Sequence, residues 1–264
     1  MKNLLFILFC FFCLYGQAQD LKFDDSGKFK IVQFTDVHFM IDNEASLSSI
    51  AMMNKVLDGE KPNLVVFSGD IVTSKDIKKA WDIVLDVVIS RNIPYVVTLG
   101  NHDDEGLWTR TQIAEYLVTK NGIVNNIATI NKVDGVLNSA ICINNGKNEN
   151  AAILYVMDSN AYSTLAQVKG YGWFSSSQIN WYKEESIKLK KSSMDTLPAL
   201  AFFHIPLPEY SIAFNDLRHK RIGVRYETEC SPAINSGMYA AMLESGDVMG
   251  VFVGHDHVND YLVD

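Results

Sequence analysis

Cysteine, proline and basic residues are all scarce in this sequence. It has 4 Cys and 6 Pro in 264 residues, and 23 Lys and Arg stand against 31 Asp and Glu. So few cysteines exclude a small disulfide-stapled domain, and the low proline and glycine content excludes a collagen-like or low-complexity chain. A net charge of −8 argues against a nucleic-acid-binding protein, which needs a basic face for phosphates. With 48% hydrophobic and 20% charged residues, the composition is that of a globular domain.

The N-terminal segment Met1–Gln19 has the pattern of a secretory signal peptide. Lys2 precedes an apolar run from Leu4 to Tyr15, and the small residues Gly16 and Ala18 follow with the spacing of a cleavage site. A run of this length is too short to cross a membrane as a helix, which takes about 20 residues. We therefore predict a cleaved leader and a periplasmic or secreted protein without stable membrane insertion.

Residues 20–264 are predicted to form one domain, because no repeat or linker interrupts them. Cys10 and Cys13 belong to the predicted leader, so only Cys142 and Cys230 remain in the domain. An exported protein permits a disulfide between these two, and two free thiols are an equal alternative.

The domain alternates short apolar runs with segments of helical period, which is the pattern of a layered α/β fold. The predicted strands lie at 29–35, 64–68, 95–99, 136–143, 151–156, 199–203 and 248–253. The predicted helices lie at 44–58, 76–91, 113–120, 175–191 and 237–245. Ser175 and Gln178 form a capping-box pattern at the start of the fourth helix.

Polar side chains follow five of these strands directly. The residues are Asp36 and His38, Asp70, Asn101 to Asp103, His204, and His255 to His257. In open α/β sheets, the loops after the strands converge at one rim, where ligands bind. Five of the six histidines are therefore expected at one site.

The residue types indicate the chemistry of this rim. A lone D-x-H is near background, whereas GNHD and GHDH should each occur by chance in about one chain in a thousand. Carboxylate, imidazole and amide oxygen without thiolate favour Fe, Mn, Zn or Co over a structural zinc site. Seven such groups are too many for one tetrahedral ion. With one carboxylate bridging, they fit two ions about 3.5–4 Å apart, as in phosphoryl-transfer enzymes.

The sequence resembles the calcineurin-like metallophosphoesterases, whose signature is D-x-H, G-D, G-N-H-[DE], H and G-H-x-H in that order. The resemblance runs from Phe29 to Asn259. It implies a four-layer α/β/β/α sandwich, with two mixed β-sheets flanked by helices. It also implies the following roles: Asp36, His38 and His257 on one metal, Asn101, His204 and His255 on the second, Asp70 as the bridge, His102 as the general acid, and Asp103 to orient His102.

Within this family the sequence is most similar to purple acid phosphatase type 29-like proteins and their bacterial relatives. The stretches that carry this are Phe202–Tyr210 and Gly254–Asp260. Purple enzymes have D-x-G and G-D-x-x-Y, with the tyrosine as an iron ligand. Here His38 and Thr73 occupy those Gly and Tyr positions, so we expect a metallophosphatase without the purple colour.

The resemblance implies an exported hydrolase that cleaves small-molecule phosphate esters by in-line attack of a metal-bridging hydroxide. Its two ions would be Fe, Mn or Zn. A phosphodiesterase or nucleotide hydrolase of the same family is an alternative, and a non-catalytic metal-binding pseudo-enzyme is another.

Two further segments leave alternatives open. Arg218 to Arg221 and Arg225 form the one basic cluster, either a solvated loop or a contact for an anionic substrate. Tyr162 and Tyr171 lie near the rim, and either pack in the core or stack on a substrate ring. In the family, further strands follow the position of Asp264, so we expect missing C-terminal strands, an unpaired edge and exposed apolar surface.

Overall fold

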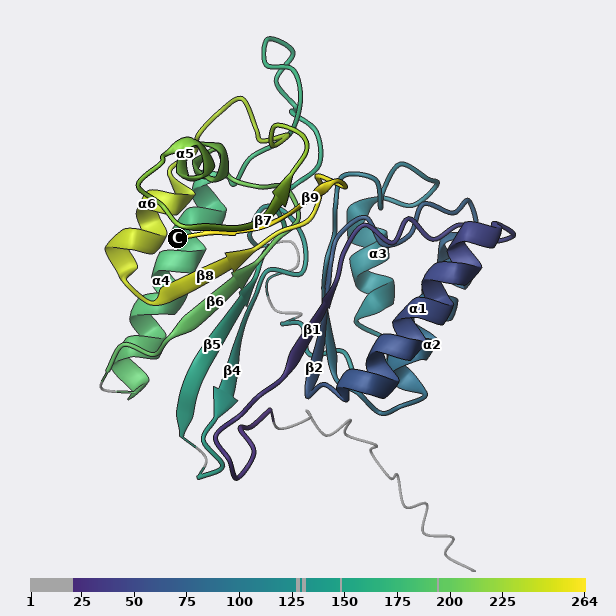
Figure 1. The fold of residues 1–264 in the computed structure, drawn as a ribbon, viewed down its shortest axis with the longest axis horizontal. Helices are drawn as coiled ribbons and strands as arrows, with labels where there is room; N and C mark the ends of the chain where they lie inside the picture. Colours follow the sequence, from purple (N-terminus) through teal and green to yellow (C-terminus); the bar gives the residue numbers. More distant parts are fainter. Residues whose placement is uncertain (1–20, 127–128, 130–131, 148, 194) are drawn as a thin grey trace, which may run out of the picture.

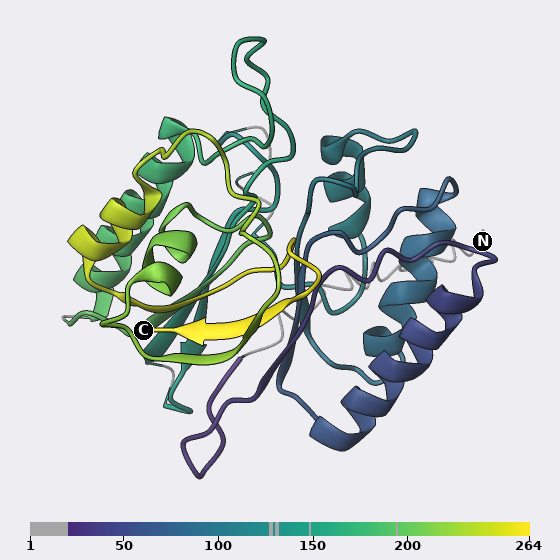
Figure 2. The same ribbon diagram turned by 45° about the horizontal axis from the view of Figure 1, so that its top comes forward.

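The chain folds into two β-sheets that lie face to face between two sets of helices (Figures 1 and 2). The computed structural model describes residues 21–126, 129, 132–147, 149–193 and 195–264. One sheet has α1, α2 and α3 on its outer side, and the other has α4, α5 and α6. This is the layered α/β sandwich expected from the sequence. The predicted signal peptide lies outside the described residues.

The first half of the chain builds a parallel three-stranded sheet in the order β1-β2-β3. Its elements are β1 (Ile31–Phe34), α1 (Glu44–Glu60), β2 (Leu64–Ser68), α2 (Ile77–Ile89), β3 (Tyr95–Thr98) and α3 (Arg110–Leu117). Every residue of β2 is buried, as expected for the central strand of a covered parallel sheet. The crossover helices leave the carboxyl ends of all three strands at one edge.

The second half builds a mixed sheet in the order β4-β5-β6-β8, in which only β4 and β5 pair antiparallel. The elements of this half of the chain are β4 (Ser139–Asn144), β5 (Asn150–Val156), α4 (Ser176–Ser193), β6 (Ala199–Phe202), α5 (Glu209–Asn215), β7 (Arg221–Arg225), α6 (Met238–Ser245), β8 (Val248–Phe252) and β9 (Asn259–Val263). Strands β7 and β9 form a separate antiparallel pair, which Figure 2 shows beside the second sheet.

Local capping explains where several helices begin. The Asn43 side chain accepts hydrogen bonds from the backbone N–H groups of Ala45 and Ser46 at the start of α1. Ser175 and Gln178 bond to each other's backbone N–H groups at 3.3 and 3.0 Å, so the predicted capping box is confirmed. A second capping box, at Thr109, begins α3 three residues before the predicted start at Ile113.

The two sheets are held together by an apolar layer between them. Leu64, Val66 and Val96 of the first sheet pack in one cluster with Leu154 and Phe202 of the second. Fully burying one such side chain contributes about 1.5–3 kcal/mol. This layer fixes the ends of β1, β2 and β3 beside those of β6 and β8, where the predicted site residues lie.

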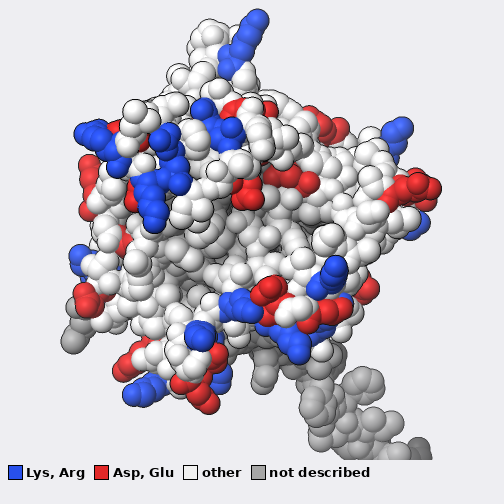
Figure 3. Space-filling view, viewed as in Figure 1, with Lys and Arg blue, Asp and Glu red and all other residues white. Residues whose placement is uncertain are grey.

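The basic cluster is in part a strand rather than a loop, because Arg221–Arg225 forms β7. Figure 3 shows basic side chains gathered over α5 and β7. Arg218 bonds Asp216 at 2.5–3.0 Å, and Arg225 bonds Glu229 at 2.7 and 2.8 Å. Both arginines therefore have carboxylate partners close to them in the sequence. Arg218 is exposed, which favours a solvated segment there, whereas Arg225 and Glu229 are largely buried.

Apolar side chains are exposed around the edge strand β8 of the second sheet. Met249, Leu243 and Leu262 have 78%, 64% and 63% of their surface exposed. Cys142 and Cys230 are free, with Cys230 exposed. Among the described residues, no helix is long and apolar enough to cross a membrane.

Candidate metal centre

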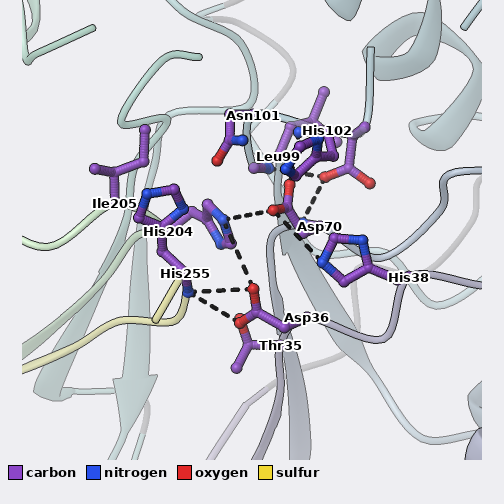
Figure 4. Close-up of polar contacts among 12 residues, drawn as sticks. Thr35, Asp36, His38, Asp70, Leu99, Asn101, His102, His204, Ile205 and His255 are labelled. Carbon is purple, nitrogen blue, oxygen red and sulfur yellow. Dashed lines mark hydrogen bonds and ion pairs between the residues drawn. The ribbon is translucent and has the colours of Figure 1, made fainter. Parts of the chain in front are cut away.

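The loops after β1, β2, β3, β6 and β8 meet at one rim and are tied together by backbone hydrogen bonds. The Asp36 N–H donates to the Gly69 carbonyl at 3.0 Å, and the Gly254 N–H donates to the His204 carbonyl at 3.0 Å. The Asp36 carboxylate in turn accepts the backbone N–H of His255 at 3.0 Å. Figure 4 shows the side chains that these loops bring together.

Four of the predicted ligands have a strained backbone. Asp36, His38, Asp70 and His255 have φ angles of 53°, 45°, 52° and 80°, in the left-handed region that favours glycine. Such conformations cost about 1–3 kcal/mol each and persist where the surrounding structure enforces them, typically at functional sites. In this backbone conformation, the four side chains point into the same space.

Glycine is required where these loops touch. A Cβ at Gly254 would lie 1.9 Å from Thr35 Oγ1 and 2.4 Å from Asp36 Oδ2. A Cβ at Gly100 would lie 2.2 Å from Asp70 Oδ1. The glycines of the G-D, G-N-H-D and G-H-D-H motifs therefore allow the close approach that assembles the site.

Gly254→Ala should therefore weaken metal binding without unfolding the protein. The new methyl group pushes on the Asp36 carboxylate, and disturbing the support of a ligand typically costs about 10–100-fold in metal affinity. Isothermal titration of the metal-free variant with Mn²⁺ measures the loss. Gly59→Ala is the matched control, because its Cβ would meet nothing within 4 Å. An unchanged Mn²⁺ affinity in Gly254→Ala would contradict the claim that the close approach at Gly254 assembles the site.

Two clusters of candidate ligands lie side by side at the rim. Asp36, His38 and His257 form one, and Asp70, His204 and His255 form the other. Within each cluster the ligand atoms lie within 4.8 Å of one another. Asp70 Oδ2 is 3.0 Å from His204 Nε2 and 3.8 Å from His38 Nε2, so it lies between the clusters, where a bridging carboxylate would be.

The residues fit metal ions because several buried polar atoms of the described residues have no partner or face only each other. Asn101 Oδ1 and His255 Nε2 have no hydrogen-bond partner there, and Asp70 Oδ2 and His204 Nε2 face each other at 3.0 Å. Buried polar atoms without partners are rare and costly. All four are residues that the sequence places on the metals, and a cation at the cluster of Asp70, His204 and His255 would satisfy the three atoms that these residues contribute.

Neighbouring groups hold these side chains in the orientation that ligation requires. His204 Nδ1 lies 3.0 Å from the Ser68 carbonyl, which keeps the proton on Nδ1 and leaves Nε2 free. The Asn101 amide donates to the Tyr162 hydroxyl at 3.2 Å, which leaves its oxygen free. The Thr35 hydroxyl donates to Asp36 Oδ2 at 2.6 Å.

The electrostatics of the site favour the ligand forms of His38, His255 and Asp70. For His204, burial lowers the pKa, but the hydrogen bond and charge of Asp70 outweigh it and raise that pKa. Burial lowers the pKa of His38, and burial together with His204 lowers the pKa of His255 to about 4, so both are neutral imidazoles at neutral pH. Burial raises the pKa of Asp70, but the hydrogen bond and charge of His204 outweigh it and lower that pKa to about 2. Asp70 is therefore an ionised carboxylate.

Comparison with known proteins decides the family. A model of the calcineurin-like phosphoesterase family matches residues 29–259. The chain belongs to this family. The match has almost the same limits as the resemblance expected from the sequence, Phe29 to Asn259.

Relatives of this chain include plant and yeast proteins. One is "Probable inactive purple acid phosphatase 29" of Arabidopsis thaliana, 33% identical over 93% of this chain and 71% of its own. Another is "Phosphatase DCR2" of Saccharomyces cerevisiae, 36% identical over 92% of this chain and 46% of its own. The structure of a dimetal phosphatase from Danio rerio has a TM-score of 0.60, covers 87% of this chain and 82% of its own, and is 14% identical. This likeness confirms the metallophosphoesterase fold.

The carboxylate of Asp103 has other partners than the His102 imidazole that the sequence predicted. Its buried carboxylate accepts four backbone N–H groups at 2.8–2.9 Å, from Asp70, Ile71, Val72 and Gly100. Burial and the charge of Asp70 raise its pKa to about 6, against the effect of the N–H donors. Asp103 therefore ties the loops after β2 and β3 together instead of orienting His102.

The partner of His102 is Glu105, which the sequence analysis missed. His102 Nδ1 lies 2.7 Å from Glu105 Oε2. The backbone N–H of His102 donates to Asp70 Oδ1 at 2.7 Å, which places this residue beside the clusters. The signal in the sequence is that Glu105 follows His102 by three residues, because one turn of the backbone can bring side chains at this spacing together.

Arg110 is a second residue that the sequence analysis missed. It donates to the backbone carbonyls of Leu99 and Gly100 at 3.2 and 2.7 Å and to Asp104 at 2.9 Å, and it bonds the buried carboxylate of Asp158. Arg110 thereby holds the loop that carries Asn101 and His102 against the second sheet.

Proposed function

We propose that this protein is a two-metal hydrolase of phosphate esters. The observation that carries the proposal is the pair of ligand clusters that lie side by side, with Asp70 Oδ2 of one cluster 3.8 Å from His38 Nε2 of the other. The buried ligand atoms Asn101 Oδ1 and His255 Nε2 have no hydrogen-bond partner among the described residues. Carboxylate, imidazole and amide ligands in this arrangement are typical of two-ion phosphoester hydrolases.

Seven residues would hold the ions in the arrangement predicted from the sequence. They are Asp36, His38 and His257 on one side, Asn101, His204 and His255 on the other, and Asp70 between them. When bound, the ions would supply a water nucleophile of lowered pKa and positive charge for the phosphoryl oxygens. The ions are proposed to be Fe, Mn or Zn.

His102 is proposed to give a proton to the leaving group. Its side chain is 37% exposed, so a substrate can reach it, and its ring lies 5.4 Å from the ring of His38. With Nδ1 turned to Glu105, the other ring nitrogen is left for the substrate. Proton transfer of this kind contributes about 10²–10⁴-fold to turnover.

A non-catalytic metal-binding protein is the second candidate, and the name of the Arabidopsis relative favours it. In this chain, however, all seven proposed ligands and His102 are present and converge at one rim. Their retention favours the catalytic function.

Hydrolysis of model esters separates the two candidates. The metal-free protein is loaded with Mn²⁺, Fe or Zn²⁺ separately and assayed with p-nitrophenyl phosphate and with bis(p-nitrophenyl) phosphate. We expect turnover of at least one ester, and the ratio between them tells a monoesterase from a diesterase or nucleotide hydrolase. Bound metal without turnover of either ester would favour the non-catalytic protein.

The metal-loaded protein is expected to lack the purple colour even with iron. Thr73 stands where purple enzymes have their iron-binding tyrosine, and its backbone N–H pairs with the Phe39 carbonyl. A visible absorption spectrum of the iron-loaded protein tests this. A strong charge-transfer band would show that a tyrosine, such as the nearby Tyr162, binds iron.

We also propose that the enzyme acts outside the cytoplasm, on a small-molecule phosphoester. The support is the signal-peptide pattern of Met1–Gln19. A mature N-terminus after Ala18 or Gln19 in the exported protein would agree with it.

A further inference from the structure

Glu105 uses both of its carboxylate oxygens beside the candidate metal centre. Oε2 lies 2.7 Å from His102 Nδ1, and Oε1 accepts the Tyr162 hydroxyl at 2.7 Å. The same hydroxyl accepts a hydrogen bond from the Asn101 amide at 3.2 Å. A closed chain of contacts thus links Asn101, Tyr162, Glu105 and His102 across two loops that lie far apart in the sequence.

An exposed pair of His and Glu three residues apart usually contributes little, because each side chain has other conformations. Here the side chains of His102 and Glu105 are 37% and 50% exposed. The difference is that Glu105 is also held by Tyr162. The ring of Tyr162 stacks on Tyr171 with 5.9 Å between centroids, and Tyr171 contacts the His255 ring at 4.4 Å. The carboxylate is therefore held from the opposite side of the site.

A fixed carboxylate at Nδ1 decides which nitrogen of an imidazole faces the substrate. When Nδ1–H donates to a carboxylate, the ring takes one tautomer and one orientation, and Nε2 faces the substrate. Nε2 gives a proton to the leaving group from the imidazolium form, which carries a proton on both nitrogens, and the ring is left as the Nδ1–H tautomer. The buried aspartate of a Ser-His-Asp triad acts on its histidine in this way. Asp103 is not available for this task, because both of its oxygens bind backbone N–H groups.

We propose that Glu105, held by Tyr162, is a positioning residue that orients the His102 imidazole towards the leaving group of the substrate. The inference rests on the proposed function of His102 as the proton donor. It assigns Tyr162 a place in the site that is neither core packing nor stacking on a substrate ring.

The first test compares esters that differ in their need for a proton. Phenyl phosphate releases a basic phenolate, whereas 2,4-dinitrophenyl phosphate releases an anion that needs no proton. In Glu105→Ala, kcat for phenyl phosphate should fall by about 10–100-fold, as for other residues that orient a reacting group. Its kcat for the dinitrophenyl ester and its KM for both should change little.

Conservative variants separate positioning from structural support. Glu105→Gln keeps an oxygen that accepts the Nδ1–H, so it should restore most of the lost turnover. Tyr162→Phe removes one anchor and should give a smaller loss with the same dependence on the leaving group. Glu185→Ala is the matched control, because it breaks an exposed pair with Lys188 of the same spacing in α4, and it should behave as the wild type.

The second test needs no activity. In the metal-free protein labelled with ¹⁵N-histidine, the ring signals of His102 are assigned by their loss in His102→Ala. We expect the Nδ1–H tautomer in the wild type and in Glu105→Gln, and a shift towards Nε2–H in Glu105→Ala. If the wild type hydrolyses neither ester, the proposed function fails, and the tautomer alone decides whether Glu105 orients His102.

The proposal is overturned if Glu105→Ala slows both esters equally or leaves the His102 tautomer unchanged. Additive losses in the double variant Glu105→Ala/His102→Ala would also overturn it, because residues that act through one another are non-additive.

Discussion

Asp70→Asn is expected to lose both metal ions and to lower turnover by about a thousandfold or more. Asp70 Oδ2 lies 3.0 Å from His204 Nε2 and 3.8 Å from His38 Nε2, so this one change would remove the proposed bridge between the two clusters. The charge stabilisation that the ions supply is several kcal/mol, and each 1.36 kcal/mol is tenfold in rate, which gives about that factor.

The variant should stay folded, because asparagine has nearly the same shape and the bond from the backbone N–H of residue 70 to Asp103 does not depend on the side chain. Metal analysis by mass spectrometry and circular dichroism measure the two effects separately. Asp58→Asn is the control, since Asp58 is 67% exposed and pairs with Arg91 away from the site. If Asp70→Asn kept two ions per chain and turnover within tenfold, Asp70 would not be the bridge.

His102→Ala is expected to lose about 10²–10⁴-fold in turnover of phenyl phosphate while keeping its metal ions. The His102 side chain bonds Glu105, and only its backbone N–H contacts Asp70, so alanine keeps the contact on which the ligand depends. The loss should be small for an ester whose leaving group needs no proton. Steady-state kinetics and metal content of the same preparation check both statements.

His219→Ala provides the control for this variant. His219 is the only histidine outside the five motifs, and its ring lies near Asp216 and Asp264. Its removal should change neither metal content nor turnover. Loss of metal in His102→Ala would make His102 a ligand and would contradict the assignment of the proton donor.

The convergence of the seven proposed ligands could be predicted because each follows the end of a strand. Strand β2 lies at Leu64–Ser68 as expected, and its neighbours β1 and β3 are parallel to it. Parallel strands put the residues that follow them at one edge whatever the loops contain. The apolar runs predicted where the strands lie, so the position of the rim could be predicted without knowledge of the contacts.

Helix α5 and strand β7 were not predicted, because their sequences carry no burial pattern. Helix α5 has no buried residue, and Pro208 at its start provides no side-chain cap. In β7, the residues Arg221–Val224 are exposed, so the segment looked like a charge run. Both depend on contacts with distant residues, such as the ring of Tyr261 against Phe214 and the pairing of β7 with β9.

The surroundings of His102 could be predicted only in part. Adjacency suggested Asp103, but the turn after β3 points that carboxylate to the backbone of the β2 loop and brings Glu105 to the imidazole instead. The backbone N–H of Glu105 contacts the His102 carbonyl at 3.4 Å, which marks the turn. Tyr162 comes from another loop and carries no motif, so its contact with Glu105 required the structure.

The most direct test of the two-metal account measures metal content and turnover in the same sample. The protein is freed of metal with a chelator, Mn²⁺ or Fe or Zn²⁺ is restored stepwise, and ions bound per chain are determined beside hydrolysis of p-nitrophenyl phosphate and its bis-ester. The account predicts turnover that rises as the content approaches two ions per chain and disappears again when the chelator returns. Two ions bound per chain without hydrolysis of either ester would contradict it.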